Sequence, residues 1–205
     1  IVEKDTALEG SASVPLEGTL LPETYLFTHG TTRAQLFAHM HAAQQKFIDA
    51  HWPTRAPNLP LANADQAIVL ASIVEKETAI PEERRHIAAV FVNRLKLGMK
   101  LQSDPTIIYG ITQGYKLGRP IRESEITAPT PYNTYAIAGL PPAPICNPGK
   151  DSIAAVLNPE PSADLYFVAD GTGGHVFAAT VQEHQKNVAK WRQIEQKLSP
   201  RLRQG

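Results

Sequence analysis

Cysteine is almost absent from this chain, since Cys146 is the only one among 205 residues. A single cysteine cannot form an internal disulfide, and it excludes a zinc site built on several thiolates. An excess of charge of one sign is also missing, because 20 Lys and Arg balance 20 Asp and Glu. A protein that binds nucleic acid normally carries a basic excess. The composition therefore argues against nucleic acid as a partner.

Long apolar runs are missing too. No stretch approaches the ~20 consecutive apolar residues of a membrane-spanning helix, and no signal peptide is recognisable. The chain begins at Ile1 without a methionine, and its first residues are small and polar. We interpret residues 1–15 as a flexible N-terminal remnant of a processed or longer protein, and residues 16–200 as one folded domain.

Motifs for metal, cofactor or nucleophile chemistry are not found. The seven His are scattered, with no His-Glu-x-x-His spacing, so a metal site is not expected. The sequence has no Gly-x-Ser-x-Gly elbow. Lys76 and Lys100 lie in charged surroundings, and no phosphate-binding loop accompanies them, which argues against pyridoxal phosphate. We therefore expect neither a metal nor an organic cofactor.

Hydrophobic periodicity predicts an α+β fold, with helices packed beside a small antiparallel β-sheet. Two short apolar runs around Asp170-Gly-Thr-Gly-Gly174 indicate a β-hairpin over 165–178. Residues 100–149 lose the periodicity and are rich in Pro, Thr, Tyr, Asn and Gly, so we expect a long, ordered and functional loop there. The predicted helices cover 31–52, 65–79, 81–97 and 180–198.

One carboxyl group stands out within Ala71-Ser-Ile-Val-Glu-Lys-Glu-Thr78. Glu77 follows Ile73 by four residues and Val74 by three, so it shares their apolar helix face, whereas Glu75 points elsewhere. Partial desolvation raises the pKa of a carboxyl, and a raised pKa suits a general acid. The alternative is a solvated Glu-Lys-Glu helix end, and the spacing alone leaves both interpretations open.

Two further segments combine amide, hydroxyl, carboxylate and phenol groups. These are Leu101-Gln-Ser-Asp-Pro-Thr-Ile-Ile-Tyr-Gly110 and Pro131-Tyr-Asn-Thr-Tyr135. Such groups suit a sugar, which needs many fixed hydrogen bonds and aromatic faces for its ring. Ordinary turn chemistry explains the same residues equally well.

The ordered series of motifs resembles the YceG-like (MltG) endolytic murein transglycosylases over roughly residues 16–190. The resemblance implies a catalytic domain over 16–200 with a lysozyme-like active-site arrangement. Several of the matching pieces are long enough to make the resemblance specific. The segments that carry it are Leu16-Glu-Gly, Leu21-Pro-Glu-Thr-Tyr25, Ala71 to Thr78, Glu83-Arg84, Val90-Phe-Val-Asn-Arg-Leu95, Gly98 to Gly110, Thr130 to Tyr135, Gly139-Leu-Pro-Pro142, Leu165 to Asp170 and Gly173-Gly-His-Val-Phe177.

Position by position, the resemblance places the family's catalytic acid on Glu77. Met99-Lys-Leu-Gln102 matches the Leu-Met-Gln element of lysozyme-like lytic transglycosylases only loosely, and Pro131 stands where their Ala-Tyr-Asn element has Ala. The individual roles of the remaining site residues therefore stay open. The expected substrate-binding residues are Glu17, Gln102, Asp104, Thr106, Tyr109, Tyr132, Asn133 and Thr134.

The resemblance further implies cleavage of the MurNAc–GlcNAc bond of peptidoglycan glycan strands, which leaves 1,6-anhydroMurNAc ends and terminates nascent strands. Expected partners are these strands and peptidoglycan synthases. The family's membrane anchor and LysM-like region are missing from this sequence, so we expect an anchored parent protein at the periplasmic face of the inner membrane. Two alternatives stay open: a non-catalytic glycan-binding module, and a muramidase that uses Asp104 as a second carboxylate.

Overall fold

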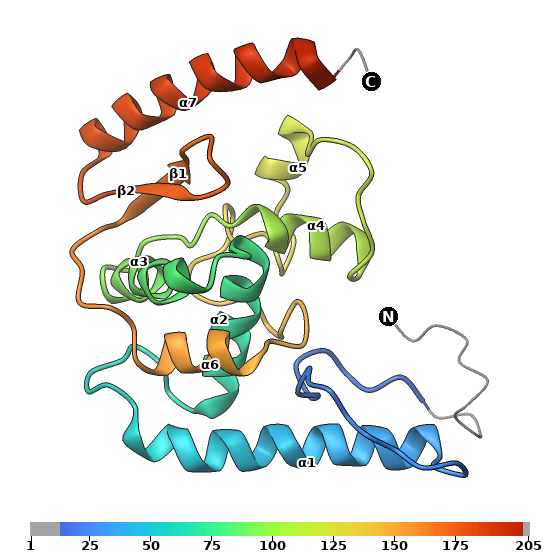
Figure 1. The fold of residues 1–205 in the computed structure, drawn as a ribbon. Helices are drawn as coiled ribbons and strands as arrows, with labels where there is room; N and C mark the ends of the chain where they lie inside the picture. Colours follow the sequence, from blue (N-terminus) through green and yellow to red (C-terminus); the bar gives the residue numbers. More distant parts are fainter. Residues whose placement is uncertain (1–12, 203–205) are drawn as a thin grey trace.

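The computed structural model describes residues 13–202, and the side chains of residues 13–197. Most of the segment expected to be a flexible remnant, residues 1–12, lies outside the described residues. The elements are arranged in levels, with α1 on one side, α2, α3 and α6 in the middle, and the hairpin with α7 on the other side (Figure 1). Their bounds are α1 Arg33–His51, α2 Ala64–Glu77, α3 Arg84–Lys96, α4 Asp104–Thr112, α5 Glu123–Thr127, α6 Lys150–Leu157, β1 Tyr166–Ala169, β2 His175–Ala178 and α7 Val181–Leu202, with 3-10 helices at Trp52–Thr54 and Pro81–Glu83.

Helix α2 forms the centre of the core. Its eight residues from Ala67 to Val74 are all buried, and α2 packs against both α3 and α6. Burial of one large aliphatic side chain contributes about 1.5–3 kcal/mol, so this helix is firmly held. A residue at the end of α2 is therefore held in a fixed position.

The local sequence determines where α2 begins and ends. The side chain of Asn63 caps its first turn by accepting a hydrogen bond from the amide of Gln66. At the other end Thr78 is extended, and Pro81 opens the following 3-10 helix. An extended residue cannot continue the helix, so α2 ends at Glu77.

The predicted fold class is confirmed. β1 and β2 pair antiparallel with Phe167 opposite Phe177, as the hairpin pattern predicts. Asp170 closes the loop, because its Oδ1 accepts hydrogen bonds from the amides of Thr172 and Gly174. Within the described residues, no helix combines the length and the apolar character that a membrane crossing requires.

The expectation of an unbroken loop over 100–149 is wrong. Helices α4 and α5 lie within it, and α6 follows directly. These helices have nine, five and eight residues, which is too short for a clear helical period. Pro105 occupies the first turn of α4, where proline is tolerated, although in a sequence it reads as a helix breaker.

Candidate active site

Glu77 stands where the end of α2 meets the start of α4. The residue is partly buried, and its Oε1 accepts a hydrogen bond of 2.5 Å from the hydroxyl of Ser103. Ser103 is the N-cap residue of α4 and is almost fully buried. No side chain or backbone group of the described residues forms a hydrogen bond with Oε2 of Glu77. The proton of the neutral acid is therefore expected on Oε2.

The surroundings of Glu77 favour its neutral form. Burial raises its pKa from 4.5 to about 7, and the nearby carboxylate of Asp104 acts in the same direction. The hydrogen bond from Ser103 opposes this, as do the charges of His175 and Arg94. A carboxyl group with a pKa near neutrality can donate a proton and take one back in the same cycle.

A buried network of hydroxyls fixes Ser103 in place. The amide of Ser103 donates to Oγ1 of Thr134, and the hydroxyl of Thr106 donates to the carbonyl of Ser103. Thr106 and Thr134 have no exposed surface, and their hydroxyls lie 2.9 Å apart. Both were expected to bind substrate, but their burial favours a positioning role.

Asn133 is placed in the same way. It is 1% exposed, and its amide nitrogen donates to the carbonyls of Glu125, Ile126 and Ala128. Its Oδ1 accepts from the amide of Tyr135. With its donors engaged, Asn133 organises the chain that follows α5, and we assign it a positioning role in place of the expected contact.

Two predicted residues near Glu77 remain open to a ligand. Gln102 is exposed and has φ 52°, a left-handed conformation that costs a non-glycine residue roughly 1 kcal/mol. Strained backbone of this kind clusters at active sites, although Asn58 and Gln113 have the same conformation outside this group. Asp104 is also exposed, and its Oδ1 accepts a hydrogen bond of 2.7 Å from the phenol of Tyr135.

The other predicted residues form a second group around α4. The rings of Tyr109 and Tyr132 pack at 4.9 Å between centroids. The carboxylate of Glu17 lies near Tyr109 and contributes to the raised pKa of its phenol. The same carboxylate lies beside Gly114. Among the described side chains, no hydrogen bond or ion pair joins this group to Glu77. The structure thus divides the predicted site into two neighbouring parts.

Several residues near Glu77 are absent from the predicted set. Glu83 holds His175 twice, because its Oε1 accepts the backbone amide at 2.8 Å and its Oε2 lies 2.7 Å from Nδ1. Arg94 is buried and donates to the carbonyls of Leu101 and Leu165. The motif segments contain all of these residues, but only the fold brings 83, 94 and 175 together. The remaining additions are Ser103 and Tyr135.

Glu75 has a separate structural role. Its Oε2 accepts hydrogen bonds from the amide of Gly149 and the hydroxyl of Ser152, so it fixes the start of α6 against α2. The two glutamates of one helical turn therefore face different partners, as their spacing predicts. In the part of the chain with described side chains, no group of three His, Cys, Asp or Glu is placed to hold a metal ion.

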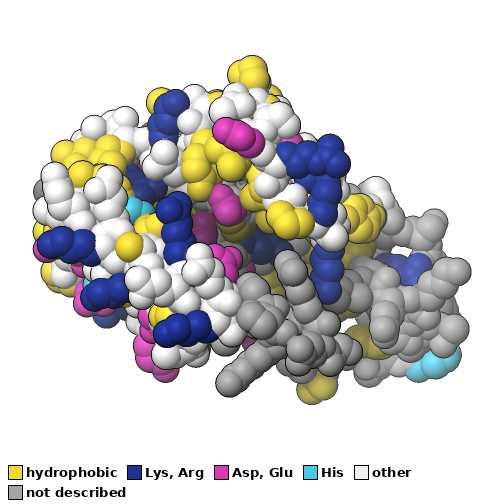
Figure 2. All heavy atoms as spheres, turned by 90° about the horizontal axis from the view of Figure 1, so that it is seen from above, with side chains coloured by type: hydrophobic (Ala, Val, Ile, Leu, Met, Phe, Trp, Pro, Cys, Tyr) yellow, Lys and Arg dark blue, Asp and Glu magenta, His cyan; other side chains and the backbone are white. Residues whose placement is uncertain are grey.

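The charges on one face of the molecule are mixed. On the face seen in Figure 2, acidic and basic side chains lie together around its hollowed centre. A mixed surface is consistent with the zero net charge of the chain. It suits a ligand that is mostly neutral and polar better than a polyanion.

The hydrogen bond from Ser103 to Glu77 gives a testable prediction. In Ser103→Ala, the charged form of Glu77 loses a donor, and a hydrogen bond to a charged group contributes about 1.5–3 kcal/mol. We expect the pKa of Glu77 to rise further, so the alkaline limb of the pH profile of kcat/KM moves up by about one unit. Ser124→Ala, at an exposed serine of α5, is the matched control. An unchanged alkaline limb in Ser103→Ala would contradict the assignment.

The fold and site together define an α+β domain with one desolvated carboxyl at the end of its central helix. A model of the YceG-like family matches residues 2–190. The chain belongs to the YceG-like family, which confirms the resemblance of its motifs. The lysozyme-like arrangement of the site stays a prediction.

Relatives of known name agree with this. The chain is 40% identical over 197 residues to an endolytic murein transglycosylase of Streptococcus pneumoniae serotype 2, covering 93% of this chain and 35% of the relative. It is 35% identical over 178 residues to one of Bacillus subtilis, covering 86% and 48%. The chain thus spans only a third to a half of these curated relatives. A crystal structure of a YceG-like protein from Listeria monocytogenes has a TM-score of 0.71 at 35% identity, covering 87% of this chain and 57% of that one.

Proposed function

We propose that this domain is a peptidoglycan lytic transglycosylase with Glu77 as its single catalytic acid and base. The observation that carries the proposal is the desolvated carboxyl of Glu77, with a pKa of about 7 and one oxygen held by Ser103. Relatives named endolytic murein transglycosylases cover most of this chain. The proposed substrate is the bond between MurNAc and GlcNAc in a glycan strand.

The reaction needs only one carboxyl because its nucleophile is part of the substrate. Neutral Glu77 donates the proton on Oε2 to the glycosidic oxygen, and the bond from that oxygen to C1 of MurNAc breaks. The C6 hydroxyl of the same sugar then attacks C1, and the carboxylate of Glu77 takes its proton. Because the nucleophile is tethered, it is already held close to C1, and no second carboxylate is needed to position and activate a water molecule. The products are a GlcNAc end and a 1,6-anhydroMurNAc end.

The exposed polar residues around Glu77 are suited to hold the sugars. Gln102 and Asp104 are open to a ligand, and Tyr132 is partly exposed. Groups of this kind can orient the N-acetyl group and stabilise the positive charge that develops at C1. The buried residues Thr106, Asn133 and Thr134 hold the backbone on which these groups stand.

The site of action follows from the substrate. We place the domain in the cell envelope, where glycan strands lie, and an anchored parent protein at the periplasmic face of the inner membrane belongs to the same proposal. There it would end the elongation of nascent strands, so peptidoglycan synthases are the partners that share its substrate.

The mass of the products tests the proposal. Purified protein incubated with glycan strands should release fragments whose new MurNAc ends lack one water relative to hydrolysed ends. Hydrolysed ends that disappear in Asp104→Asn would instead show a muramidase with two carboxylates. Binding of strands without any cleavage would show a non-catalytic module and overturn the proposal.

A further inference from the structure

A cavity lies at the junction of α2 and α4 beside the candidate acid, and the proposed reaction does not use it. Its volume is about 410 Å³, within the range of about 300–1,000 Å³ that is usual for ligand pockets. The end of α2 contributes Lys76, α4 contributes Pro105 and Tyr109, and the loop after α4 closes the far side. Lys76 directly precedes Glu77 in the chain, and Pro105 directly follows Asp104. The cavity and the acid therefore share one junction between two helices.

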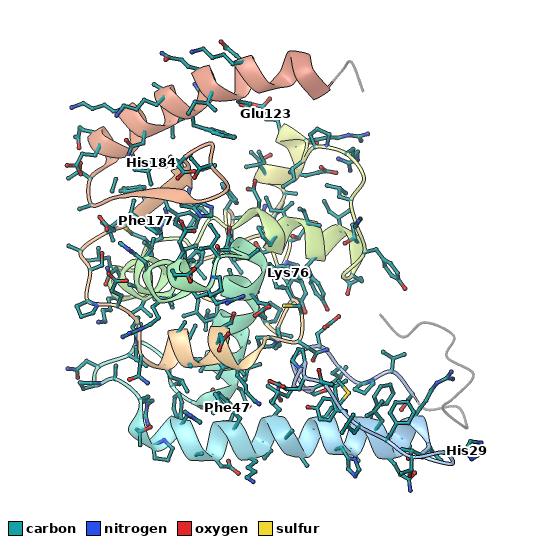
Figure 3. All side chains as sticks on the ribbon, viewed as in Figure 1. His29, Phe47, Lys76, Glu123, Phe177 and His184 are labelled. Carbon is teal, nitrogen blue, oxygen red and sulfur yellow. The ribbon has the colours of Figure 1, made fainter. Side chains whose placement is uncertain are left out.

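The lining of this cavity contains cations and no carboxylate, although the carboxylate of Glu17 lies beside Gly114 at its edge. Lys76 and Lys116 are exposed cations of its lining, and no carboxylate of the described side chains forms an ion pair with either of them. Arg119 differs, because Glu125 holds it through two hydrogen bonds. Figure 3 shows Lys76 at the end of α2 on the side of α4. The cavity thus offers two free positive charges to a ligand.

The walls between these charges are mainly apolar. Ile108, Leu117 and Ile145 line the cavity together with Pro105. The hydroxyl of Thr112, a further lining residue, already donates to the carbonyl of Ile108 within its own helix. Neutral sugars need several fixed donors and acceptors, and the uncharged polar side chains of this lining are few, chiefly the phenols of Tyr109 and Tyr115. A ligand with small apolar groups and carboxylates fits it better.

The substrate proposed above carries such a ligand. The lactyl group of each muramoyl sugar bears a short peptide, which combines alanine methyl groups with free carboxylates. We propose that the cavity binds this stem peptide on the muramoyl sugar at the cleavage point. Because peptides occur on MurNAc and not on GlcNAc, binding one here sets the register of the strand. Glu77 then faces the MurNAc–GlcNAc bond and not the GlcNAc–MurNAc bond that alternates with it along the strand. This inference rests on the proposed function.

Peptide-bearing strands and strands stripped of peptides by an amidase provide the test. We expect the wild-type protein to favour peptide-bearing strands in kcat/KM by roughly tenfold at low salt, since two free lysines contribute. The double variant Lys76→Met/Lys116→Met should lose this preference and keep its rate on stripped strands. Lys96→Met/Lys186→Met, at two exposed lysines elsewhere, is the matched control. A double variant that keeps the preference, or that slows equally on both substrates, would overturn the inference.

A binding measurement separates this inference from the proposed function. Calorimetry with a synthetic stem tetrapeptide and its carboxyl-amidated form needs no cleavage. Binding of the free acid that is lost in the amidated peptide and in the double variant supports the cavity, even if no strand is cut. Equal binding of both peptides, or none of either, would overturn the inference even if strands are cut as proposed.

Discussion

Glu77→Gln is expected to reduce cleavage of glycan strands by about 10²–10⁴-fold, which is the usual contribution of a positioned general acid. The amide keeps the shape of the neutral acid, and its oxygen can still accept the hydrogen bond from Ser103. The fold should therefore survive while proton donation is lost. Release of anhydro fragments per unit time, measured by mass spectrometry, gives the rate.

Glu75→Gln is the matched control, because Glu75 is two residues away on the same helix. It accepts hydrogen bonds from Gly149 and Ser152, and a glutamine oxygen can accept them as well. This variant should retain most of the activity. If Glu75→Gln were inactive and Glu77→Gln active, Glu75 would be the catalytic acid and Glu77 the structural residue.

The second large effect concerns stability. The folded pKa of Glu77 is about 7, above its ordinary value of 4.5, so the folded state holds this proton more tightly than the unfolded state. Below pH 4.5 both states are protonated, and burial of the carboxyl carries no ionic cost. As the pH rises through 7, the folded protein should lose up to about 3 kcal/mol of unfolding free energy through this group.

Glu77→Gln removes that loss, because glutamine does not ionise. Urea unfolding at pH 4 should give similar free energies for both proteins, whereas at pH 9 the variant should be more stable by up to about 3 kcal/mol. Glu82→Gln, at an exposed glutamate, should follow the wild type at both pH values. Parallel pH curves for wild type and Glu77→Gln would place the carboxyl in a solvent-like environment. A variant that is inactive but more stable at pH 9 would show that the buried carboxyl needed for activity lowers the stability of the fold.

The helices predicted from the sequence are those with long, regular apolar periods, and the hairpin was predicted from its turn residues between two short apolar runs. The spacing of Ile73, Val74 and Glu77 placed Glu77 on the apolar helix face, because helix geometry relates these positions, but it left a solvated helix end open as the alternative. The same reasoning could not predict α4, α5 and α6, whose few turns give little period. Proline at 105 also concealed a helix start.

The contents of the site were harder to predict than its acid. Polar residues such as Thr106, Asn133 and Thr134 look alike in a sequence whether they contact a ligand or hold a backbone. Only their burial and hydrogen bonds distinguish the two. Glu83 and His175 are 92 positions apart in the chain, and no local pattern relates them.

The position of Glu77 on α2 has a consequence for partial unfolding. Proteins open in units, and segments with few buried contacts open before the core helices do. The loop that lines the cavity beside Lys76 is largely exposed over 113–118, whereas α2 is buried along most of its length. On warming, the loop should therefore open while Glu77 is still held in place by α2. Substrate binding should be lost at a lower temperature than the ability to donate the proton.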